Sequence, residues 1–448
     1  MLNFAKTPGQ GFTALNMNTS TTNQDQGLSS ANPDILHPNE IVATVIMTRV
    51  SEYFGFFVFA IACALVFPEV FFPNYDLIAG TLISFGVFSL AFIARPFARL
   101  IFGPLDHRIG RAARITVAMF LLGASTIFVG FIPGYADIGI IAPVLLCLTR
   151  IGQGLGAGGV SEGLPIIMMM NAPDNKKSWY SMVPQIGGPV GFFVAASIYF
   201  VLTNYLTPEE FVDWGWRFPF MVVLSLQVVA LFTRLRLIDT PEYKQAVNHH
   251  YLHGSPVREV LQNHWLQVIL GAYLPLASYA LFHIVTIFLL GYIRLFPGLS
   301  VPELLSMQAT GAVLAIFTCI LSGPLADRFG RRRFLMVITA MVGVLSFFIG
   351  SMQDNAWAFV LFGFGLLGLC FGQSGGTLPH RFEREYRFTG VSLSTDLGWL
   401  FGAAFAPIIA LGLTIRFGLE FAGYYLLSGV VVTLIALFIT QRMVSSRN

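Results

Sequence analysis

Charged side chains are scarce in this sequence. Asp, Glu, Lys and Arg make up 11% of its 448 residues, whereas hydrophobic residues make up 55%. A soluble domain carries about 25% charged residues, so this chain has too few to cover a surface that faces water. The formal net charge is only +3 and there is no basic tract, which gives no indication of a nucleic-acid partner. The composition therefore excludes an ordinary soluble protein and favours one that lies in a membrane.

Motifs for catalysis and for bound cofactors are also missing. There is no G-x-x-x-x-G-K-S/T phosphate loop, no His-Glu-x-x-His metal motif and no G-x-S-x-G nucleophile elbow. The glycine-rich stretch 154–163 has no preceding strand, which argues against a nucleotide site. The four cysteines lie in apolar runs without metal-ligand spacing: Cys63, Cys147, Cys319 and Cys370. We therefore predict a protein that is not an enzyme, binds no metal and needs no cofactor.

Long apolar runs fill the chain after residue 40. A helix needs about 20 apolar residues to cross a bilayer. Twelve runs meet this requirement and are the predicted spans: 41–67, 77–101, 115–132, 139–171, 179–203, 217–237, 264–293, 303–326, 334–352, 357–380, 389–416 and 421–442. The first 40 residues are polar and lack a basic segment followed by a short apolar core, so we expect a mobile cytoplasmic tail and no cleaved signal peptide.

Basic residues are distributed unevenly between the two sides of these spans. If the N-terminus lies in the cytoplasm, 20 of the 26 Lys and Arg residues fall on the cytoplasmic side. Arg217, Arg294 and Arg416 fall at the outer ends of spans. The remaining three lie in or near the membrane: Arg49, Arg95 and Arg150. Because cytoplasmic loops carry an excess of Lys and Arg, the sequence predicts a multi-pass protein with both termini in the cytoplasm.

The two halves of the chain repeat each other. The pattern Gly-Pro-Leu-x-x-Arg-x-Gly-Arg begins at Gly103 and again at Gly323, 220 residues later. The longest inner loop separates these halves. Internal repeats of this kind build a central site between two bundles in many transporters. The predicted fold is therefore an all-α membrane protein with twelve transmembrane helices in two pseudo-symmetric six-helix bundles. Its predicted parts are a tail at 1–40, bundles at 41–237 and 264–442, a central cytoplasmic loop at 238–263 and a tail at 443–448.

The second copy of this pattern carries a family resemblance. Residues 323–332, Gly-Pro-Leu-Ala-Asp-Arg-Phe-Gly-Arg-Arg, resemble the signature loop of the major facilitator superfamily, at one of the places where that family carries it. Glycine permits a tight turn. Asp327 is able to accept hydrogen bonds from a helix N-terminus, and the arginines are able to pair with acids or helix C-termini. The resemblance implies the major facilitator fold and a gating contact on the cytoplasmic side.

Shorter motifs along nearly the whole chain are similar to the metabolite:proton symporters of that superfamily. Members of this family carry organic acids, shikimate-like compounds, proline or betaines. The resemblance implies proton symport and a cytoplasmic (inner) membrane location. The motifs are Ala94-Arg95-Pro96, Ile132-Pro133, Arg150-Ile-Gly-Gln153-Gly154, Trp214-Gly-Trp216-Arg217, Asp239-Thr240-Pro241-Glu242-Tyr243 and Arg387-Phe-Thr389-Gly390-Val-Ser392.

Three positions depart from the family pattern. Gly55 stands where the first span usually carries an acid, and Val160 stands where the fourth span usually carries Glu. Glu162 follows two residues after Val160, which turns it by about 200° around a helix. In the first signature loop, His107 occupies the usual Asp position and Asp106 precedes it.

Ionisable residues inside the predicted spans are the first functional candidates, because a charged side chain is costly in a bilayer. Glu52 lies three residues after Arg49 and shares a helix face with it. Glu162 lies in the fourth span and Asp396 in the eleventh. We predict that Glu52, Glu162 and Asp396 take part in proton coupling. The alternative for each is a static ion pair between helices.

Polar residues of the first, fourth, fifth and seventh spans are candidate substrate contacts. An arginine can bind a carboxylate with two parallel hydrogen bonds. Two residues of the seventh span, four apart, share one helix face. The histidine of this pair could instead be an ordinary core residue. The predicted substrate contacts are Arg49, Tyr53, Gln153, Gln185, Tyr279 and His283.

Charged residues of the signature loops and their neighbours are candidate gating residues. We expect their replacement to slow transport and to leave affinity nearly unchanged. The set is Arg95, Asp106, Arg108, Arg111, Asp327, Arg328, Arg331 and Arg387.

The sequence thus predicts a secondary active transporter that moves a small organic acid or zwitterion by alternating access, with proton symport as the drive. We expect its partners to be that substrate, protons and the lipid bilayer, and we expect it to act as a monomer. A diverged importer or exporter of a siderophore or drug is the alternative within this class. A membrane sensor that binds a metabolite without transporting it is an alternative of another class.

Overall fold

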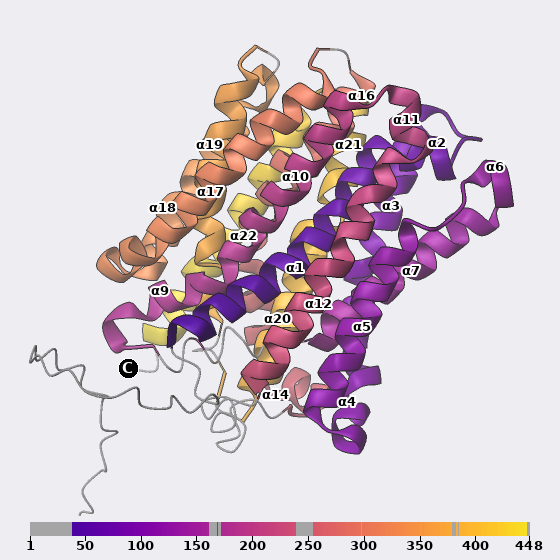
Figure 1. Ribbon diagram of the computed structural model, residues 1–448. Coiled ribbons are helices and arrows are strands. Elements are labelled where there is room, and N and C mark those ends of the chain that lie inside the picture. The colour runs from indigo at the N-terminus through magenta and orange to yellow at the C-terminus, as the bar shows by residue number, and fades with distance from the viewer. Residues whose placement is uncertain are drawn as a thin grey trace, which may run out of the picture. The chain divides into compact units, whose positions relative to one another are not determined.

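Segments that cross a bilayer must form helices or closed barrels, because the bilayer core offers no water to hydrogen-bond free backbone groups. In the computed structural model every regular element is helical, among the residues that it describes (Figure 1). These are residues 38–160, 168, 172–238, 254–296, 298–352, 354–378, 382–383 and 385–445. They confirm the prediction of an all-α protein.

The first half of the chain extends from Pro38 to Ile238. Its helices are α1 (Pro38–Leu65), α2 (Phe67–Phe71), α3 (Leu77–Ala94), η1 (Arg95–Phe97), α4 (Ala98–Ile109), α5 (Arg111–Val129), α6 (Tyr135–Ile138), α7 (Ile141–Val160), η2 (Asp174–Lys176), α9 (Lys177–Met182), η3 (Val183–Ile186), α10 (Gly187–Tyr205), α11 (Pro208–Asp213), η4 (Gly215–Arg217) and α12 (Phe218–Ile238). Pro96 and Pro184 lie in the short 3₁₀ turns η1 and η3. Proline has no backbone N–H to donate, so each of these spans continues through a tighter turn.

The second half of the chain begins at Val257. Its helices are α14 (Val257–Tyr273), α15 (Leu276–His283), η5 (Ile284–Phe288), α16 (Leu289–Leu295), α17 (Val301–Phe329), α18 (Arg331–Ser346), η6 (Ile349–Ser351), α19 (Ala356–Gly372), η7 (Gly375–Thr377), α20 (Arg387–Trp399), η9 (Leu400–Ala404), α21 (Ala406–Phe417) and α22 (Glu420–Ser445). The segments η5 and η9 are π-helical turns. Turns of this kind often occur at functional sites.

Eleven helical segments of the described chain are long and apolar enough to cross a membrane. They correspond to eleven of the twelve predicted spans. The remaining prediction, 334–352, contains α18 and η6. Helix α18 has only 16 residues and begins with three arginines, 331–333, so it is shorter and less apolar than the others.

The seventh span differs from its prediction. The apolar run 264–293 was expected to form one helix, but α14 ends at Tyr273 and the apolar span is Leu276–Leu295. Pro275 has a non-helical backbone and separates α14 from α15. A proline inside a helix removes a hydrogen bond and clashes with the preceding turn, which explains the break. Helix α14 also begins at Val257, within the range 238–263 predicted as a loop.

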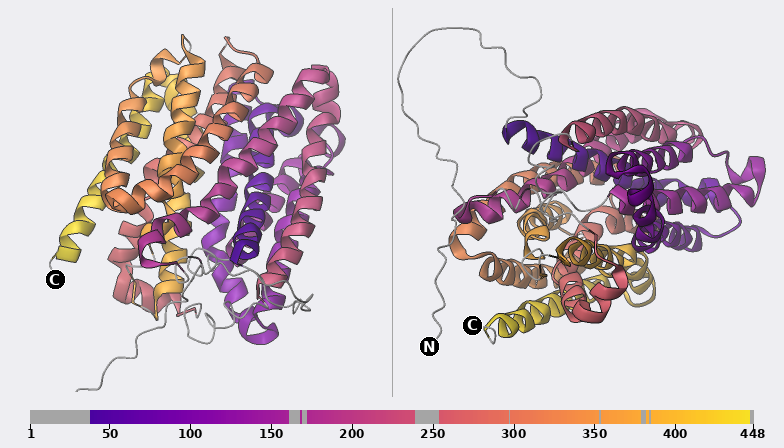
Figure 2. Two further views of the ribbon diagram at one scale, coloured as in Figure 1. Left: turned by 60° about the vertical axis from the view of Figure 1, so that its left-hand side comes forward. Right: turned by 90° about the horizontal axis from the view of Figure 1, so that it is seen from below.

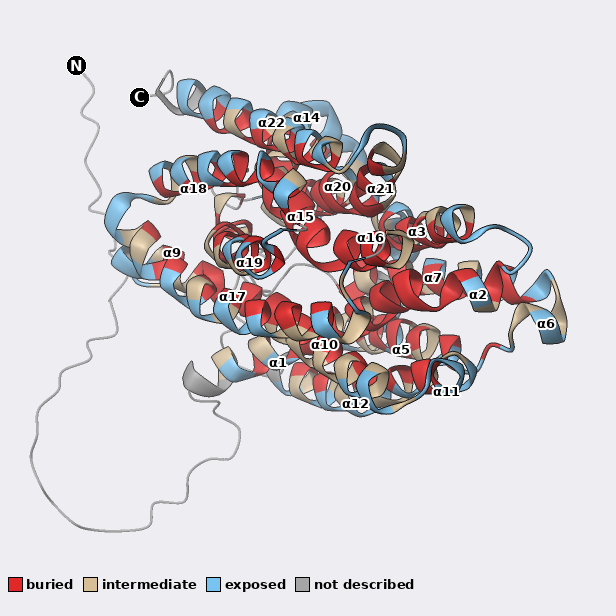
Figure 3. Cartoon of the chain, turned by 90° about the horizontal axis from the view of Figure 1, so that it is seen from above, coloured by how far each residue is buried: buried red, intermediate tan, exposed pale blue. Residues whose placement is uncertain are grey.

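The two halves lie next to each other in both views of Figure 2, with the first half in indigo to magenta and the second in orange to yellow. Most spans bury one side and expose apolar side chains on the other, as expected for helices that face lipid. The segment Leu276–Leu295 is an exception because its apolar window is entirely buried, and α15 and α16 are red in Figure 3. Candidate residues Tyr279 and His283 therefore lie on the most enclosed span of the described chain.

Candidate functional site

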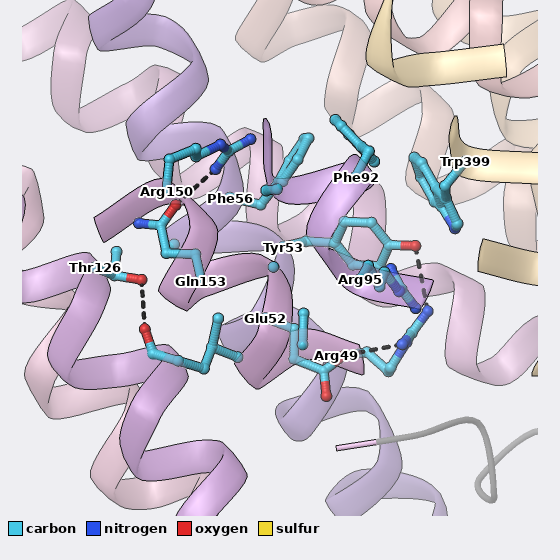
Figure 4. A pocket seen from close by; sticks show the side chains of 15 residues that line it. Arg49, Glu52, Tyr53, Phe56, Phe92, Arg95, Thr126, Arg150, Gln153 and Trp399 are labelled. Carbon is cyan, nitrogen blue, oxygen red and sulfur yellow. Dashed lines mark hydrogen bonds and ion pairs between the residues drawn. The ribbon is translucent and has the colours of Figure 1, made fainter. Parts of the chain in front are cut away.

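A small cavity lies in the middle of the first half, against the second. Helices α1, α3, α5 and α7 and the turn η1 supply most of its lining, and Trp399 of α20 supplies a wall from the second half. Its volume is about 80 Å³, whereas ligand pockets usually measure about 300–1,000 Å³. The cavity therefore has space for a few water molecules. Its polar lining residues are Arg49, Glu52, Tyr53, Arg95, Thr126, Arg150 and Gln153 (Figure 4).

Arg150 of α7 is the most deeply buried charge of this lining, with 1% of its surface exposed. Its Nε atom donates to the Phe88 carbonyl oxygen at 3.0 Å. The rings of Phe56, Phe59 and Phe88 lie 5.2, 4.2 and 4.7 Å from its Cζ atom. No carboxylate among the described residues pairs with it. Aromatic faces stabilise a cation only partly, so this guanidinium remains available to an anion.

Gln153 lies one helical turn after Arg150 and lines the same cavity. Its Oε1 atom accepts a hydrogen bond of 2.7 Å from Arg150 Nη1. The Nε2 atom of Gln153 and the Nη2 atom of Arg150 are buried and have no hydrogen-bond partner in the described structure. Buried donors are nearly always satisfied, so each such exception calls for an explanation. Two unpartnered donors beside one cavity are suited to the oxygen atoms of a carboxylate.

Helix α7 packs closely against α3, and this packing holds the donors of Arg150 and Gln153 beside the cavity. A Cβ atom on Gly154 would collide with the carbonyl oxygen of Ala91 in α3. A Cβ atom on Gly158 would collide with the carbonyl oxygen of Arg95 in the same way. Small residues allow such close packing between membrane helices. The glycine-rich stretch of the sequence thus brings Arg150 and Arg95 to one cavity.

Glu52 and Arg49 form the ion pair that the sequence predicted on α1. Arg49 Nη1 lies 2.8 Å from Glu52 Oε2. Arg234 of α12, which sequence reasoning did not single out, lies 3.3 Å from Glu52 Oε1. The carboxylate therefore bridges two arginines from different helices. Buried ion pairs seldom add net stability, so Glu52 stays a candidate for proton coupling.

Asp396 of α20 pairs with Arg95, at 2.7 Å from its Nε atom. The pair joins the second half to the first, and Arg95 lines the cavity. From the sequence, Arg95 and Arg387 are both candidate gating residues. In the structure, Arg387 lies near the carbonyl oxygen of Phe382. Asp396 thus contacts a lining residue of the cavity without being part of the lining itself.

Aromatic rings close the cavity toward the second half. Tyr53 lies 6.4, 6.0 and 6.1 Å from the rings of Phe282, Phe371 and Trp399, measured between centroids. Tyr279 stacks on Trp399 at 4.0 Å. Tyr53 lines the cavity, whereas Tyr279 lies behind Trp399 and is not part of the lining.

Two other candidates lie away from the cavity or outside the described residues. Gln185, in η3, is buried, and its Nε2 atom packs against Gly375 of the second half. Glu162 is outside the described residues. Its predicted role in proton coupling stays a prediction.

The signature loop of the second half makes the contact that the sequence predicted. Asp327 of α17 accepts hydrogen bonds from the backbone N–H groups of Ser178 and Trp179, at 2.8 and 3.1 Å. These two residues begin helix α9, where free N–H groups attract a carboxylate. Arg331 donates to the Gly376 carbonyl oxygen and lies 3.2 Å from Ser181 Oγ. We call the Asp327 contacts with Ser178 and Trp179 the Asp327 latch.

The signature loop of the first half shows no such contact in the described residues. A Cβ atom on Gly103 would meet nothing within 4 Å, whereas one on Gly323 would lie 2.9 Å from Trp179 Cα. The side chain of Asp106 is outside the described part. Arg108 and Arg328 are exposed, and Arg111 is half-buried with a partner of its own. The roles of these residues in gating remain predictions.

The opposite end of the bundle also has contacts between the halves. Arg294 of α16 pairs with Glu69 of α2. Nearer the level of the cavity, Ser89 Oγ of α3 donates to the carbonyl oxygen of Ala404, at 2.6 Å. A hollow of about 640 Å³ borders the Glu69–Arg294 pair and carries acidic residues. The cavity is thus bounded by contacts at both ends.

Sequence reasoning missed Arg150 as a binding residue. A usable signal was present, because the positions three and four residues away are Leu146, Cys147, Gln153 and Gly154, none of them acidic. An arginine in an apolar span without an acid one turn away cannot be neutralised by its own helix. Arg234 had no comparable signal, since its partner Glu52 is distant in sequence.

Comparison with known proteins agrees with this architecture. The family model of the Major Facilitator Superfamily matches residues 45–407. The inner membrane metabolite transport protein YhjE of Escherichia coli strain K12 is 38% identical over 411 residues, which cover 90% of this chain and 93% of that protein. The shikimate transporter of the same organism is 31% identical, covering 86% of this chain and 90% of its own. The proline/betaine transporter of Salmonella typhimurium strain LT2 is 27% identical, covering 86% and 79%.

A solved structure shares the fold. The proton:xylose symporter XylE, bound to 6-bromo-6-deoxy-D-glucose, matches with a TM-score of 0.67 at 14% sequence identity, covering 90% of this chain and 95% of its own. These findings confirm the twelve-helix, two-bundle fold and the predicted family, and they identify a multi-pass membrane transporter of metabolites that is not an enzyme. The chain belongs to the Major Facilitator Superfamily.

Proposed function

We propose that this chain moves a small organic anion or zwitterion across the cytoplasmic membrane together with protons, by alternating access between its two halves. The observation that carries the proposal is the pair of unpartnered donors on Arg150 and Gln153 in the central cavity. A substrate carboxylate would satisfy both donors in a site from which water is largely excluded. Hydrogen bonds to a charged group are worth about 1.5–3 kcal/mol each.

The local charge balance supports an anionic substrate. Among the described residues, Arg49, Arg95 and Arg150 line the cavity, and Glu52 is the single acid of the lining. Asp396 lies directly behind Arg95. Isolated positive charge inside a membrane is costly. An anion that enters this cavity lowers that cost.

Coupling to protons follows from competition for the arginines. A substrate carboxylate that binds Arg95 or Arg49 competes with Asp396 or Glu52 for the same guanidinium. A buried carboxylate that loses its cationic partner is stabilised by taking up a proton. Substrate and proton then cross together. Asp396 and Glu52 are the proposed coupling residues within the described part of the chain, and Glu162 remains a third candidate.

Alternating access requires contacts that break at each end of the cavity in turn. The Asp327 latch lies at the end that carries the signature loops, and the Glu69–Arg294 pair lies at the other. The excess of Lys and Arg assigns the latch end and both termini to the cytoplasm. A single chain contains the whole cavity, so we propose a monomer as the working unit. The printed names of the relatives, which include a shikimate and a proline/betaine transporter, favour an organic acid or zwitterion.

Proteoliposomes test this proposal. The purified chain is reconstituted, a pH gradient is imposed, and uptake is measured for monocarboxylates, dicarboxylates, hydroxy acids and betaines. We expect at least one class of compound to accumulate, and we expect this accumulation to collapse when a protonophore removes the pH gradient. Accumulation should be lost in the Arg150→Gln variant and kept in the Arg333→Gln variant. Arg333 is an exposed arginine at the start of α18 and serves as the matched control.

Other outcomes of this experiment favour the alternatives. Uptake restricted to siderophores or hydrophobic drugs, or proton-driven flux only in the opposite direction, indicates a specialised importer or exporter. Binding of a metabolite without any exchange indicates a sensor. Accumulation that is unchanged in Arg150→Gln removes the observation on which the proposal depends.

A further inference from the structure

One buried histidine has hydrogen-bonding groups that nothing in the described structure satisfies. His283 is the last residue of α15 and is fully buried. Neither its Nδ1 nor its Nε2 atom has a hydrogen-bond partner. A neutral imidazole has one donor and one acceptor nitrogen, and buried groups of this kind are nearly always paired. The site therefore contains an unused donor and an unused acceptor.

Aromatic rings from both halves surround this histidine. The ring of His283 lies 5.7 Å from Phe56 and 5.6 Å from Phe88, measured between centroids. Phe92 and Trp399 lie 6.0 and 6.1 Å away. Phe56, Phe92 and Trp399 also line the central cavity, whereas His283 does not. The imidazole is thus separated from the cavity by one layer of side chains.

Two of these rings also contact Arg150. Its Cζ atom lies 5.2 Å from the Phe56 ring and 4.7 Å from the Phe88 ring. Of these two rings, Phe56 has more room to rotate, because it lines the cavity and is only partly buried, whereas Phe88 is fully buried. Figure 4 shows Phe56 beside Arg150 at the cavity wall. A rotation of Phe56 would place the unpartnered groups of Arg150 and His283 around one space.

The backbone directly after His283 departs from regular α-helix. The π-helical turn η5 begins at Ile284 and interrupts the regular α-helical hydrogen bonding. Gln308 of α17 donates from Nε2 to the carbonyl oxygens of Val285 and Thr286, at 2.8 and 2.6 Å. Gln308 therefore hydrogen-bonds to carbonyl oxygens of the π-helical turn. The imidazole of His283, directly before that turn, has no hydrogen-bond partner in the described structure.

The present cavity volume also requires movement. About 80 Å³ is too small for a metabolite of the proposed class. The cavity can enlarge only if a lining side chain moves. Phe56 lies between the cavity and the unpartnered nitrogen atoms of His283. Moving Phe56 would therefore expose these nitrogen atoms to a polar ligand.

We propose that His283 is a second polar contact for the transported anion, reached when Phe56 moves out from between it and the cavity. The compound would then carry a carboxylate for Arg150 and, at its other end, a hydroxyl or oxo group for the imidazole. This inference rests on the proposed function and narrows its substrate class to hydroxy or oxo carboxylic acids. His283 acts in it as a specificity-determining residue.

The test compares matched ligands on the full chain in detergent. Binding is measured by thermal shift and calorimetry for pairs of acids that differ by one hydroxyl group, such as propionate and lactate, or benzoate and 3-hydroxybenzoate. We expect the native chain to bind one hydroxy acid about tenfold more tightly than its partner, as one satisfied buried polar group predicts. In His283→Phe the preference should fall to about twofold or less, while the weaker acid binds as before. His264→Phe makes the same change at a histidine near Phe382 and Tyr386, away from the cavity, and should keep the preference.

A second pair of variants protects the test against a folding defect. Phe56→Ala removes the proposed partition and should tighten binding of the hydroxy acid about fivefold, and the double variant Phe56→Ala/His283→Gln should retain part of that gain because Gln still hydrogen-bonds. A hydroxyl preference that persists in His283→Phe, or that is absent from the native chain while its carboxylates still bind, overturns this inference and leaves the proposed function standing. A native chain that binds no carboxylate overturns both.

Discussion

Two of the contacts that join the halves at the signature-loop end differ in their chemistry. At the first, Asp327 of α17 accepts hydrogen bonds from the backbone of α9, and both partners on α9 are uncharged amides. At the second, Arg95 of η1 and Asp396 of α20 form an ion pair that borders the cavity. The first contact contains no residue of the cavity lining, whereas the second shares its arginine with the lining. We infer that one junction holds the closed state and that the other reports on the substrate.

The two signature loops also differ in their contacts, although their sequences are similar. Offset by 220 residues, Asp327 corresponds to His107. Histidine in place of aspartate removes the carboxylate that makes the latch, and Gly103 contacts nothing on its open side. The duplicated motif is thus used twice with different results.

Replacing Asp396 should have the largest effect and separate the two junctions most sharply. We expect Asp396→Asn to abolish proton-driven accumulation while exchange of substrate across the membrane stays within about threefold of the native rate. The reason is that asparagine keeps the shape but cannot carry the proton. Both fluxes are measured in proteoliposomes, with Asp354→Asn, an exposed carboxylate before α19, as control. Full accumulation in Asp396→Asn would assign the pair a static role.

Replacing Asp327 should slow the cycle without uncoupling it. The Asp327→Asn variant weakens two charge-assisted hydrogen bonds to α9, and we expect turnover to fall about tenfold while the apparent affinity changes by no more than about twofold. Initial rates over a range of substrate concentrations measure both quantities. A large loss of affinity with normal turnover would place Asp327 in binding instead, and the contrast between the junctions would disappear.

The equivalent glycines of the two loops offer a matched pair. A Cβ atom at position 323 lies 2.9 Å from Trp179 Cα, but one at position 103 has no neighbour within 4 Å. We expect Gly323→Ala to reduce turnover about fivefold by forcing α9 and α17 apart, and Gly103→Ala to leave it unchanged. The comparison uses initial uptake rates at saturating substrate. Equal effects at both positions would show that the loops are used alike.

The ion pair at the opposite end should matter least. Glu69 has a side chain that is 45% exposed, and exposed ion pairs contribute about 0–1 kcal/mol. We expect Glu69→Gln to change the transport rate by about twofold or less, with the difference shrinking as salt screens the native pair. Glu209→Gln, which lines the same hollow, is the control. A tenfold effect that persists at high salt would make this pair a gate equal to the latch.

The spans could be predicted from sequence because bilayer thickness imposes a local rule on length and apolarity. The Asp327 latch could also be predicted from a general rule, because a carboxylate is stabilised by the free N–H groups of a helix N-terminus. Pro275 could have indicated the helix break, but it lies inside a long apolar run that favoured a single span. The π turn at Ile284 depends on Gln308 from another helix, and no local pattern encodes such a contact.

The candidate site was predicted only in part. Arg49, Glu52, Tyr53 and Gln153 were candidates from the sequence, because each lies in a span and carries a polar group, and all four line the cavity. The pairing of Asp396 with Arg95 was not predicted, because the two residues are far apart in sequence and only helix packing brings them together. Arg150 was noticed as a charge in the membrane, but its lack of a carboxylate partner emerged only once its neighbours were known. The sequence thus identifies the polar and charged side chains of the spans, whereas the partner of each side chain depends on how the helices pack.

The most direct test of the central claim is the charge selectivity of binding at Arg150. Calorimetry on the native chain and on Arg150→Gln would compare an acid that binds with its neutral carboxamide. We expect the native chain to prefer the carboxylate by about 10- to 100-fold, as one charge-assisted hydrogen bond predicts, and the variant to bind both weakly and alike. The same strong preference for the carboxylate in Arg150→Gln would contradict the account, because the anion would then be bound elsewhere.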